Sequence, residues 1–137
     1  MKVLQFAFGD DMPCSIHIPH QYDTENCIVY TGTHDNTTTK AWFKSESTKE
    51  NRKNLECYLG RPVTKDNVHY KLIRLAYASV ARLAIIPVQD VLGLGKKARM
   101  NTPSSIENNW AWRLGPGELK QDHGKMLREL SRIFGRL

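Results

Sequence analysis

The sequence predicts an α/β fold in which parallel strands are connected by helical crossovers. Three short runs of apolar and β-favouring residues, at 2–8, 27–32 and 84–92, have the nearly continuous apolar composition of strands buried on both faces. A strongly amphipathic segment before the third run is typical of a crossover helix. The resulting βαβαβ order predicts parallel strands, since each crossover returns the chain to the same end of the sheet.

Turn residues mark where each of these strands is expected to end. The first run, KVLQFAF, is closed by Gly9, Asp10 and Asp11, and the second, CIVYT, is closed by Gly32. Thr and Asn residues then crowd together before AWF at 41–43, which is typical of a helix N-cap. The third run, AIIPVQDVL, ends at a Gly-Leu-Gly turn.

The remaining segments are expected to form helices and one long loop. Residues 44–65 are charged and interrupted by a glycine and a proline, which predicts a helix and its exit. The next helix is expected to begin at Asp66 as its N-cap. Its apolar stripe consists of Val68, Leu72, Leu75, Ala76, Val80 and Leu83. Prolines and polar clusters predict a loop over 96–117. A terminal helix is expected over 118–134, carrying Leu119, Met126, Leu127, Leu130 and Phe134.

The composition is that of one small globular domain. The chain has 137 residues, 40% hydrophobic and 25% charged, which excludes the disordered, collagen-like and coiled-coil classes. No apolar run approaches the roughly 18 residues of a membrane span. The start, MKVLQFAFGDD, is a poor signal peptide. The three cysteines form no CxxC pair and cannot all be bridged, so we expect a reduced, cytoplasmic protein without a zinc site.

Polar side chains that follow each predicted strand form the candidate site. They are Asp10 and Asp11, then His34, Asp35 and Asn36, then Gln89 and Asp90. The carboxyl ends of parallel strands are where α/β proteins build their sites, so the three clusters would face one pocket. Some of these residues could instead cap the following helix. A cap, however, does not need the pair of His34 and Asp35.

The three tryptophans divide into two kinds. Trp42, after the Thr-rich segment, is expected in the core. Trp110 and Trp112 lie in the polar segment NNWAWRL, where a core position is less automatic. A flat aromatic ring can cover the apolar face of a pyranose while Asp, Asn and His bond its hydroxyls. The alternative is that this loop packs against the body of the protein.

Several sequence blocks in register resemble one enzyme family. YTGTHDNTTTKAW (30–42), AIIPVQDVLGLGKKARMNTP (84–103) and NNWAWRL (108–114) resemble the 4-α-glucanotransferases of the amylomaltase, or disproportionating enzyme, type. MKVLQFAF (1–8) and IPHQY (18–22) fit the same family in the same order. The resemblance implies that residues 1–137 form a single partial domain, the last three βα units of a (β/α)8 TIM barrel.

The resemblance also implies an activity and its site residues. The family transfers segments of α-1,4-glucans between sugar acceptors by a retaining mechanism, through a glycosyl group held on an aspartate. Asp35 matches the family's third catalytic carboxylate, which binds the 2- and 3-hydroxyls of the sugar. Candidate substrate contacts are His34, Asp10, Asn101 and Trp110. The resemblance places the nucleophile and the acid/base outside this chain and implies no cofactor and no metal.

The length of the chain shapes the remaining expectations. A complete barrel takes roughly 250 residues, so we expect a C-terminal portion whose partners are α-1,4-glucans, malto-oligosaccharides and the remainder of the barrel. We expect no nucleic-acid or membrane partner, and no activity from this portion alone. One alternative is a non-catalytic α-glucan-binding fragment. Another is a basic nucleic-acid-binding module at 120–137, where five basic residues against two acidic ones give a net charge of +3 within a chain of net charge +6.

Overall fold

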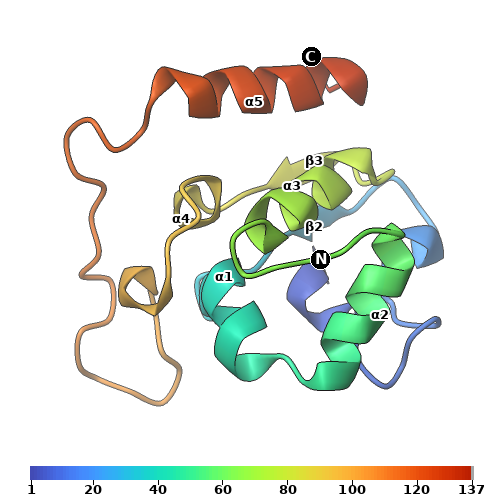
Figure 1. Ribbon diagram of the computed structural model, residues 1–137, viewed down its shortest axis with the longest axis horizontal. Coiled ribbons are helices and arrows are strands. Elements are labelled where there is room, and N and C mark those ends of the chain that lie inside the picture. Colours follow the sequence, from blue (N-terminus) through green and yellow to red (C-terminus); the bar gives the residue numbers. More distant parts are fainter. Residues whose placement is uncertain (137) are drawn as a thin grey trace.

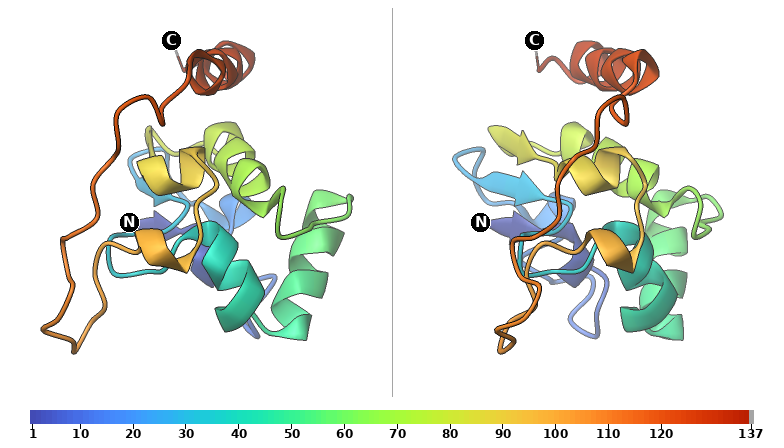
Figure 2. Two further views of the ribbon diagram at one scale, coloured as in Figure 1. Left: turned by 60° about the vertical axis from the view of Figure 1, so that its left-hand side comes forward. Right: turned by 90° about the vertical axis from the view of Figure 1, so that its left-hand side faces the viewer.

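The computed structural model describes residues 1–136 and contains a three-stranded parallel sheet in the order β1-β2-β3. The strands are β1 (Lys2–Val3), β2 (Ile28–Tyr30) and β3 (Leu83–Ile85). In the central strand, Val29 pairs with Lys2 on one side and Ala84 on the other. The helices of the body gather on one side of the sheet (Figure 1, Figure 2). The predicted α/β class and the parallel strand direction are confirmed.

The two connections between the strands differ in kind. The chain between β1 and β2 contains only the 3-10 helices η1 (Leu4–Phe6) and η2 (Pro19–Gln21). The chain between β2 and β3 carries α1 (Thr39–Ala41), the π-helix η3 (Trp42–Glu46), α2 (Lys49–Leu59) and α3 (Val68–Ala78). The expected helical crossover is therefore present between β2 and β3, whereas an irregular loop with short 3-10 turns links β1 to β2.

The strands are shorter than predicted because two of the apolar runs leave the sheet. After β1 the run continues as η1, and after β3 it continues as α4 (Val88–Val91). Pro87, the N-cap of α4, has no N–H to donate to a neighbouring strand and has a φ of −57°, which suits a helix start. Gln89 and Asp90 consequently lie in a short helix rather than at the end of a strand.

Local capping residues explain where the helices begin and end. The Thr38 hydroxyl accepts a hydrogen bond from the Ala41 backbone N–H at 3.3 Å, as expected for an N-cap of the segment that holds Trp42. Thr48 and Asn51 form a capping box at the start of α2. Gly60 ends α2 with a φ of 62°, a left-handed conformation that an L side chain disfavours.

Helix α3 is shorter than the predicted helix at both ends. Its N-cap is Asn67, so the prediction of Asp66 as the cap was wrong. The buried stripe contains Val68, Leu72 and Ala76 as predicted. The predicted members Val80 and Leu83, however, are 59% and 53% exposed and follow the end of the helix. The helix stops because its C-cap, Ser79, adopts an extended backbone that leads the chain toward β3.

The core lies between the sheet and the helices on its covered side. Its fully buried side chains include Leu4, Phe8, Ile18, Val29, Leu55 and Leu72. Trp42, 6% exposed, belongs to this core, which confirms its predicted place. The opposite face of the sheet carries the alternate strand residues, Ile28, Tyr30, Leu83 and Ile85. This open sheet face is apolar, and Ile85 is 43% exposed on it.

The C-terminal part of the chain runs as an extended segment to an outlying helix (Figure 1, Figure 2). After the 3-10 helix η4 (Lys96–Ala98) the predicted loop is present, and α5 (Gln121–Ile133) confirms the predicted terminal helix. Leu130 of α5 packs against Ile73 of α3 and Val91 of α4. Leu119, predicted on this helix, precedes it and is 52% exposed. No helix formed by residues 1–136 has the length and apolar character needed to cross a membrane.

Candidate functional site

The loop after β2 presents His34 and Asp35 at its tip. The Asn36 side-chain carbonyl accepts hydrogen bonds from the backbone N–H and the hydroxyl of Thr33, both at 2.9 Å. These bonds close a tight turn, and the Asn36 backbone N–H adds a third to the Thr33 carbonyl at 3.2 Å. The turn leaves the side chains of His34 and Asp35 57% and 50% exposed. The two side chains that could contact a ligand, His34 and Asp35, therefore lie on a loop whose backbone is stabilised by hydrogen bonds between Thr33 and Asn36.

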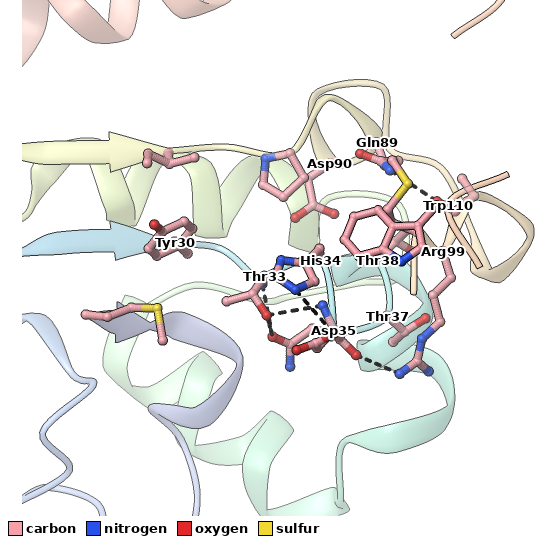
Figure 3. Close-up of a pocket in the computed structure, with 17 residues that line it drawn as sticks. Tyr30, Thr33, His34, Asp35, Thr37, Thr38, Gln89, Asp90, Arg99 and Trp110 are labelled. Carbon is pink, nitrogen blue, oxygen red and sulfur yellow. Dashed lines mark hydrogen bonds and ion pairs between the residues drawn. The ribbon is translucent and has the colours of Figure 1, made fainter. Parts of the chain in front are cut away.

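This loop forms one wall of a cavity of about 440 Å³ beyond the carboxyl ends of β2 and β3 (Figure 3). The other walls come from α4 and from the segment that follows η4. The lining includes Tyr30, His34, Asp35, Gln89, Arg99 and Trp110. The topology places the cavity here, because the polar residues follow strands that all end at the same edge of the sheet.

The segment after η4 is bonded directly to the loop tip. The Asn101 side-chain amide donates to Asp35 Oδ1 at 2.6 Å, and the Asn101 backbone N–H donates to the His34 carbonyl at 3.1 Å. Arg99 donates to the Asp35 backbone carbonyl at 2.8 Å. His34 Nε2 also lies 3.4 Å from Asp35 Oδ1. Among residues 1–136 no hydrogen-bond donor meets Asp35 Oδ2, so that oxygen is free to accept from a ligand.

An indole and an imidazole lie side by side above the carboxylate. The rings of His34 and Trp110 have centroids 5.1 Å apart and an interplanar angle of 39°. Trp110 is 53% exposed and its backbone N–H donates to the Met100 carbonyl at 2.7 Å. Its φ of 60° is unusual for a bulky residue, so the surrounding loop holds the Trp110 backbone in a sparsely populated conformation. Trp112 is half-buried and does not line the cavity.

A second carboxylate, that of Asp90, lies behind the loop and is only 2% exposed. It accepts hydrogen bonds from Thr31 and Thr39. Burial raises the pKa of Asp90, and these hydrogen bonds act in the opposite direction. Half-buried His69 stands near this carboxylate, and burial lowers the pKa of its imidazole while Asp90 opposes that shift.

The structure brings most of the predicted site residues together. His34, Asp35 and Trp110 line the cavity, and Asn101 contacts Asp35. Asp10 is exposed and does not line it. Arg99 was not singled out from the sequence, whereas Asp90 was expected in the third polar cluster but without its partners Thr31 and Thr39. The RMN triplet that contains Asn101 was the available signal for Arg99, while nothing local in the sequence identifies the distant partners of Asp90.

The arrangement is suited to holding hydroxyl groups. A half-exposed carboxylate offers acceptors, an imidazole offers a donor or an acceptor, and an indole offers an apolar face. Within residues 1–136 no three His, Cys, Asp or Glu side chains gather as a metal site. Two carboxylates, those of Asp35 and Asp90, line this cavity. Both oxygens of Asp90 are already hydrogen-bonded, so among residues 1–136 the free carboxylate oxygen at the cavity belongs to Asp35. The described residues thus place one carboxylate with an unbonded oxygen at this cavity.

Fold and site together define an α/β protein with a cavity at the carboxyl ends of its parallel strands, lined by side chains suited to a sugar. Comparison with known proteins identifies the family. A sequence profile of the 4-alpha-glucanotransferases matches residues 1–119, and the chain belongs to that family.

Three known proteins illustrate the similarity and its extent. The 4-alpha-glucanotransferases of Synechocystis and Thermus thermophilus are each 45% identical to the chain, over 99% and 100% of it. Those alignments cover 26% and 28% of the two relatives, so the chain spans about a quarter of their length. The solved structure of an amylomaltase from Streptococcus agalactiae in complex with acarbose matches 98% of the chain, with a TM-score of 0.90 and 36% identity. That match covers 27% of the amylomaltase chain.

Proposed function

We propose that this chain is the C-terminal portion of a 4-α-glucanotransferase that transfers α-1,4-glucan segments between sugar acceptors with retention of configuration. The observation that carries the proposal is the cavity in which Asp35, His34 and Trp110 stand together, in a chain that belongs to this family. The amylomaltase that matches the chain was solved in complex with acarbose, which supports an oligosaccharide as the kind of ligand.

In this proposal Asp35 binds the 2- and 3-hydroxyls of the sugar whose bond is cut. Its Oδ2 is free to accept one hydroxyl, while Asn101 orients Oδ1 from the other side. As the glycosidic bond breaks, positive charge develops on the sugar ring and its hydroxyls become more acidic, so their bonds to a carboxylate strengthen. His34 and Trp110 contact the same sugar, through a hydrogen bond and through the ring face. We retain Asp10 only as a more distant contact, since it does not line this cavity.

The proposed reaction requires two further carboxylates, which we assign to the rest of the enzyme. A retaining transfer uses one carboxylate as the nucleophile that forms the glycosyl–enzyme bond. A second carboxylic acid, about 5 Å away, protonates the leaving oxygen and later deprotonates the acceptor's 4-hydroxyl. The open sheet face and the unpaired edges of β1 and β3 support a neighbouring partner, the remainder of a (β/α)8 barrel.

The test is to incubate the full-length protein and the 137-residue chain separately with maltotriose and analyse the products. We expect glucose and longer oligosaccharides from the full-length protein and none from the chain alone. Binding of malto-oligosaccharides by a full-length protein that never transfers them would favour the glucan-binding alternative. RNA binding with a steep salt dependence would favour the nucleic-acid alternative instead.

The free cysteines support our assignment of the protein to the cytoplasm. The thiols of Cys14 and Cys57 are exposed and suit a reducing environment. Cell fractionation with an antibody against the chain tests this placement.

A further inference from the structure

The loop that carries His34 and Asp35, residues 32–38, is held at both ends by one buried carboxylate, that of Asp90. Asp90 Oδ1 accepts from the Thr39 backbone N–H at 2.8 Å. Asp90 Oδ2 accepts from the hydroxyls of Thr31 at 2.5 Å and Thr39 at 2.7 Å. Thr31 precedes the loop and Thr39 follows it, so a single side chain fixes the distance that the loop must span.

A second buried side chain, that of Gln5 in η1, supports the same loop from the chain that follows β1. The Gln5 side-chain amide donates to the Thr37 carbonyl at 3.0 Å, and its backbone N–H donates to the Thr31 carbonyl at 3.3 Å. A Cβ at Gly32 would lie 2.5 Å from Gln5 Nε2, so only glycine allows this close approach. The base of the loop is therefore set by side chains from two other elements, while its tip faces the cavity.

We propose that Asp90 is a positioning residue for the transfer reaction, holding the 32–38 loop so that Asp35 and His34 meet the sugar in the productive geometry. This inference rests on the proposed function of the site. Asp90 reaches no ligand itself, because both of its oxygens are bonded to Thr31 and Thr39. It acts through the loop and is not a catalytic residue.

The burial of Asp90 indicates that this side chain fixes the geometry of the 32–38 loop rather than filling space in the core. Taking a carboxylate out of water is costly, and well-packed apolar residues often stabilise such a position as well or better. Asp90 is 2% exposed, and the hydroxyls and N–H that satisfy it all belong to the two threonines that flank the loop. A hydrogen-bonded carboxylate specifies one loop geometry, which a non-directional apolar contact does not.

Asp90→Ala and Asp90→Asn in the full-length enzyme test the proposal. Misplacing a reacting group by about 1 Å can cost 10²-fold in rate, so we expect Asp90→Ala to lower kcat by about 10²-fold. We expect a smaller change in KM, because the sugar still contacts the cavity walls. Asp90→Asn keeps an acceptor for the Thr39 N–H and can donate to a threonine hydroxyl. It should therefore stay within about tenfold of wild-type kcat.

A matched control separates positioning from stability. Leu55→Ala removes a fully buried side chain of α2 that does not line the cavity, so it should lower the melting temperature while leaving kcat within about twofold. Hydrogen exchange of the 32–38 amides should accelerate in Asp90→Ala and not in Leu55→Ala. If Asp90→Ala does not fold, Thr31→Val and Thr39→Val remove two of the three bonds singly and should give graded losses of kcat.

Three outcomes would count against the proposal in different ways. A folded Asp90→Ala enzyme with kcat within about twofold of wild type would overturn it, and so would an equal loss of kcat in Leu55→Ala. Unchanged exchange of the 32–38 amides in Asp90→Ala would remove its physical basis. A wild-type enzyme without glucan transfer would overturn the proposed function itself, while the exchange measurement would still report whether Asp90 holds the loop.

Discussion

At the scale of single residues, Asp35 and Asp90 show how environment separates two carboxylates that serve one loop. Asp35 is half exposed and has one oxygen bonded by Asn101 and the other free. Asp90 is 2% exposed with both oxygens bonded. The first arrangement leaves a charge available to a ligand, and the second uses the charge to fix a backbone. Both residues follow apolar runs in the sequence, so local pattern alone cannot assign these different roles.

Asp35→Asn in the full-length enzyme should lower kcat by about 10²–10³-fold, or roughly 3–4 kcal/mol of transition-state stabilisation. The amide keeps the shape but removes the charge that opposes the developing positive charge of the sugar. KM should change less, because the ground-state sugar is uncharged. Steady-state kinetics with maltotriose measure both constants.

A capping role for Asp35 makes the opposite prediction. It would cost about 1 kcal/mol of stability and leave turnover near normal. The hydrogen bond from Ala41 to Thr38 already assigns the N-cap of α1 to Thr38. A thermal melt of the same Asp35→Asn variant distinguishes the two roles, and normal turnover with a lowered melting temperature would remove Asp35 from the catalytic residues.

His69 should make folding stability depend on pH in the mildly acidic range. Burial lowers its pKa from the ordinary 6.5, reinforced by Lys40 and opposed by Asp90 and Asp66. Nδ1 is buried without a hydrogen-bond partner among the described residues. The unfolded chain therefore takes up the proton at a higher pH than the folded chain, so stability falls as pH decreases from 6.5 toward the folded-state pKa and levels off below it.

For one such group, the free energy of unfolding changes by at most about 1.4 kcal/mol per pH unit. Thermal melts between pH 7.5 and 5.5 should show the decline, and His69→Gln should flatten it. Half-buried His17, whose pKa is lowered chiefly by burial, contributes in the same direction and remains in that variant. An identical slope in His69→Gln would mean that other groups control the acid response.

At the scale of elements, the sequence predicted which segments are apolar and helical better than it predicted their ends. The continuous run at 84–92 indicated burial correctly for Val91 but missed the helix that Pro87 starts. The α3 stripe was predicted to extend to Leu83, because an apolar period cannot show where the backbone leaves the helix. Likewise Asp35 and His34 were predictable as neighbours of a strand end and Trp110 as a tryptophan in a polar segment, whereas the contacts of Arg99 and Asp90 depend on tertiary packing.

Helix α5 should detach from the body when Arg136 is removed. The guanidinium donates to the backbone carbonyls of Tyr77, Ala81 and Ser79 at 2.7, 2.9 and 2.7 Å, at the end of α3. Losing these charge-assisted bonds should cost about 2 kcal/mol of the free energy that docks the helix. Faster amide exchange in α5 of Arg136→Ala measures the effect, with exposed Arg132→Ala as the control. Equal exchange in the two variants would contradict it.

Two glycine-to-alanine substitutions should change stability in opposite directions. Gly60 has a φ of 62° at the end of α2, so Gly60→Ala should cost about 1 kcal/mol. Gly124 lies inside α5, where an added Cβ meets nothing within 4 Å, so Gly124→Ala should stabilise that helix by up to about 1 kcal/mol. Urea unfolding and α5 amide exchange measure the two effects, and a stabilising Gly60→Ala would contradict the role of its backbone conformation.

At the scale of the whole molecule, helices cover one side of the sheet and leave its other side open (Figure 2). Apolar side chains of β2 and β3 line the open sheet face, and β1 and β3 have unpaired edges in the three-stranded sheet. Such edges and faces pair readily with other chains. The chain covers about a quarter of the relatives it matches, which is consistent with a sheet that continues in the longer proteins.

We therefore predict that the chain on its own associates in solution through its open sheet face, whereas the full-length protein does not use this face. Sedimentation velocity of the chain should show a concentration-dependent increase in mass. Leu83→Lys combined with Ile85→Lys places two charges on that face and should shift association to at least tenfold higher concentration, a change of about 1.4 kcal/mol or more.

Val80→Lys is the control, since Val80 is 59% exposed but lies outside the strands. If Val80→Lys weakens association as much as the double variant, a general increase in charge is responsible and the open sheet face is not the contact. If the chain stays monomeric at all concentrations, the three strands are sufficient by themselves and no further strands are needed to cover them.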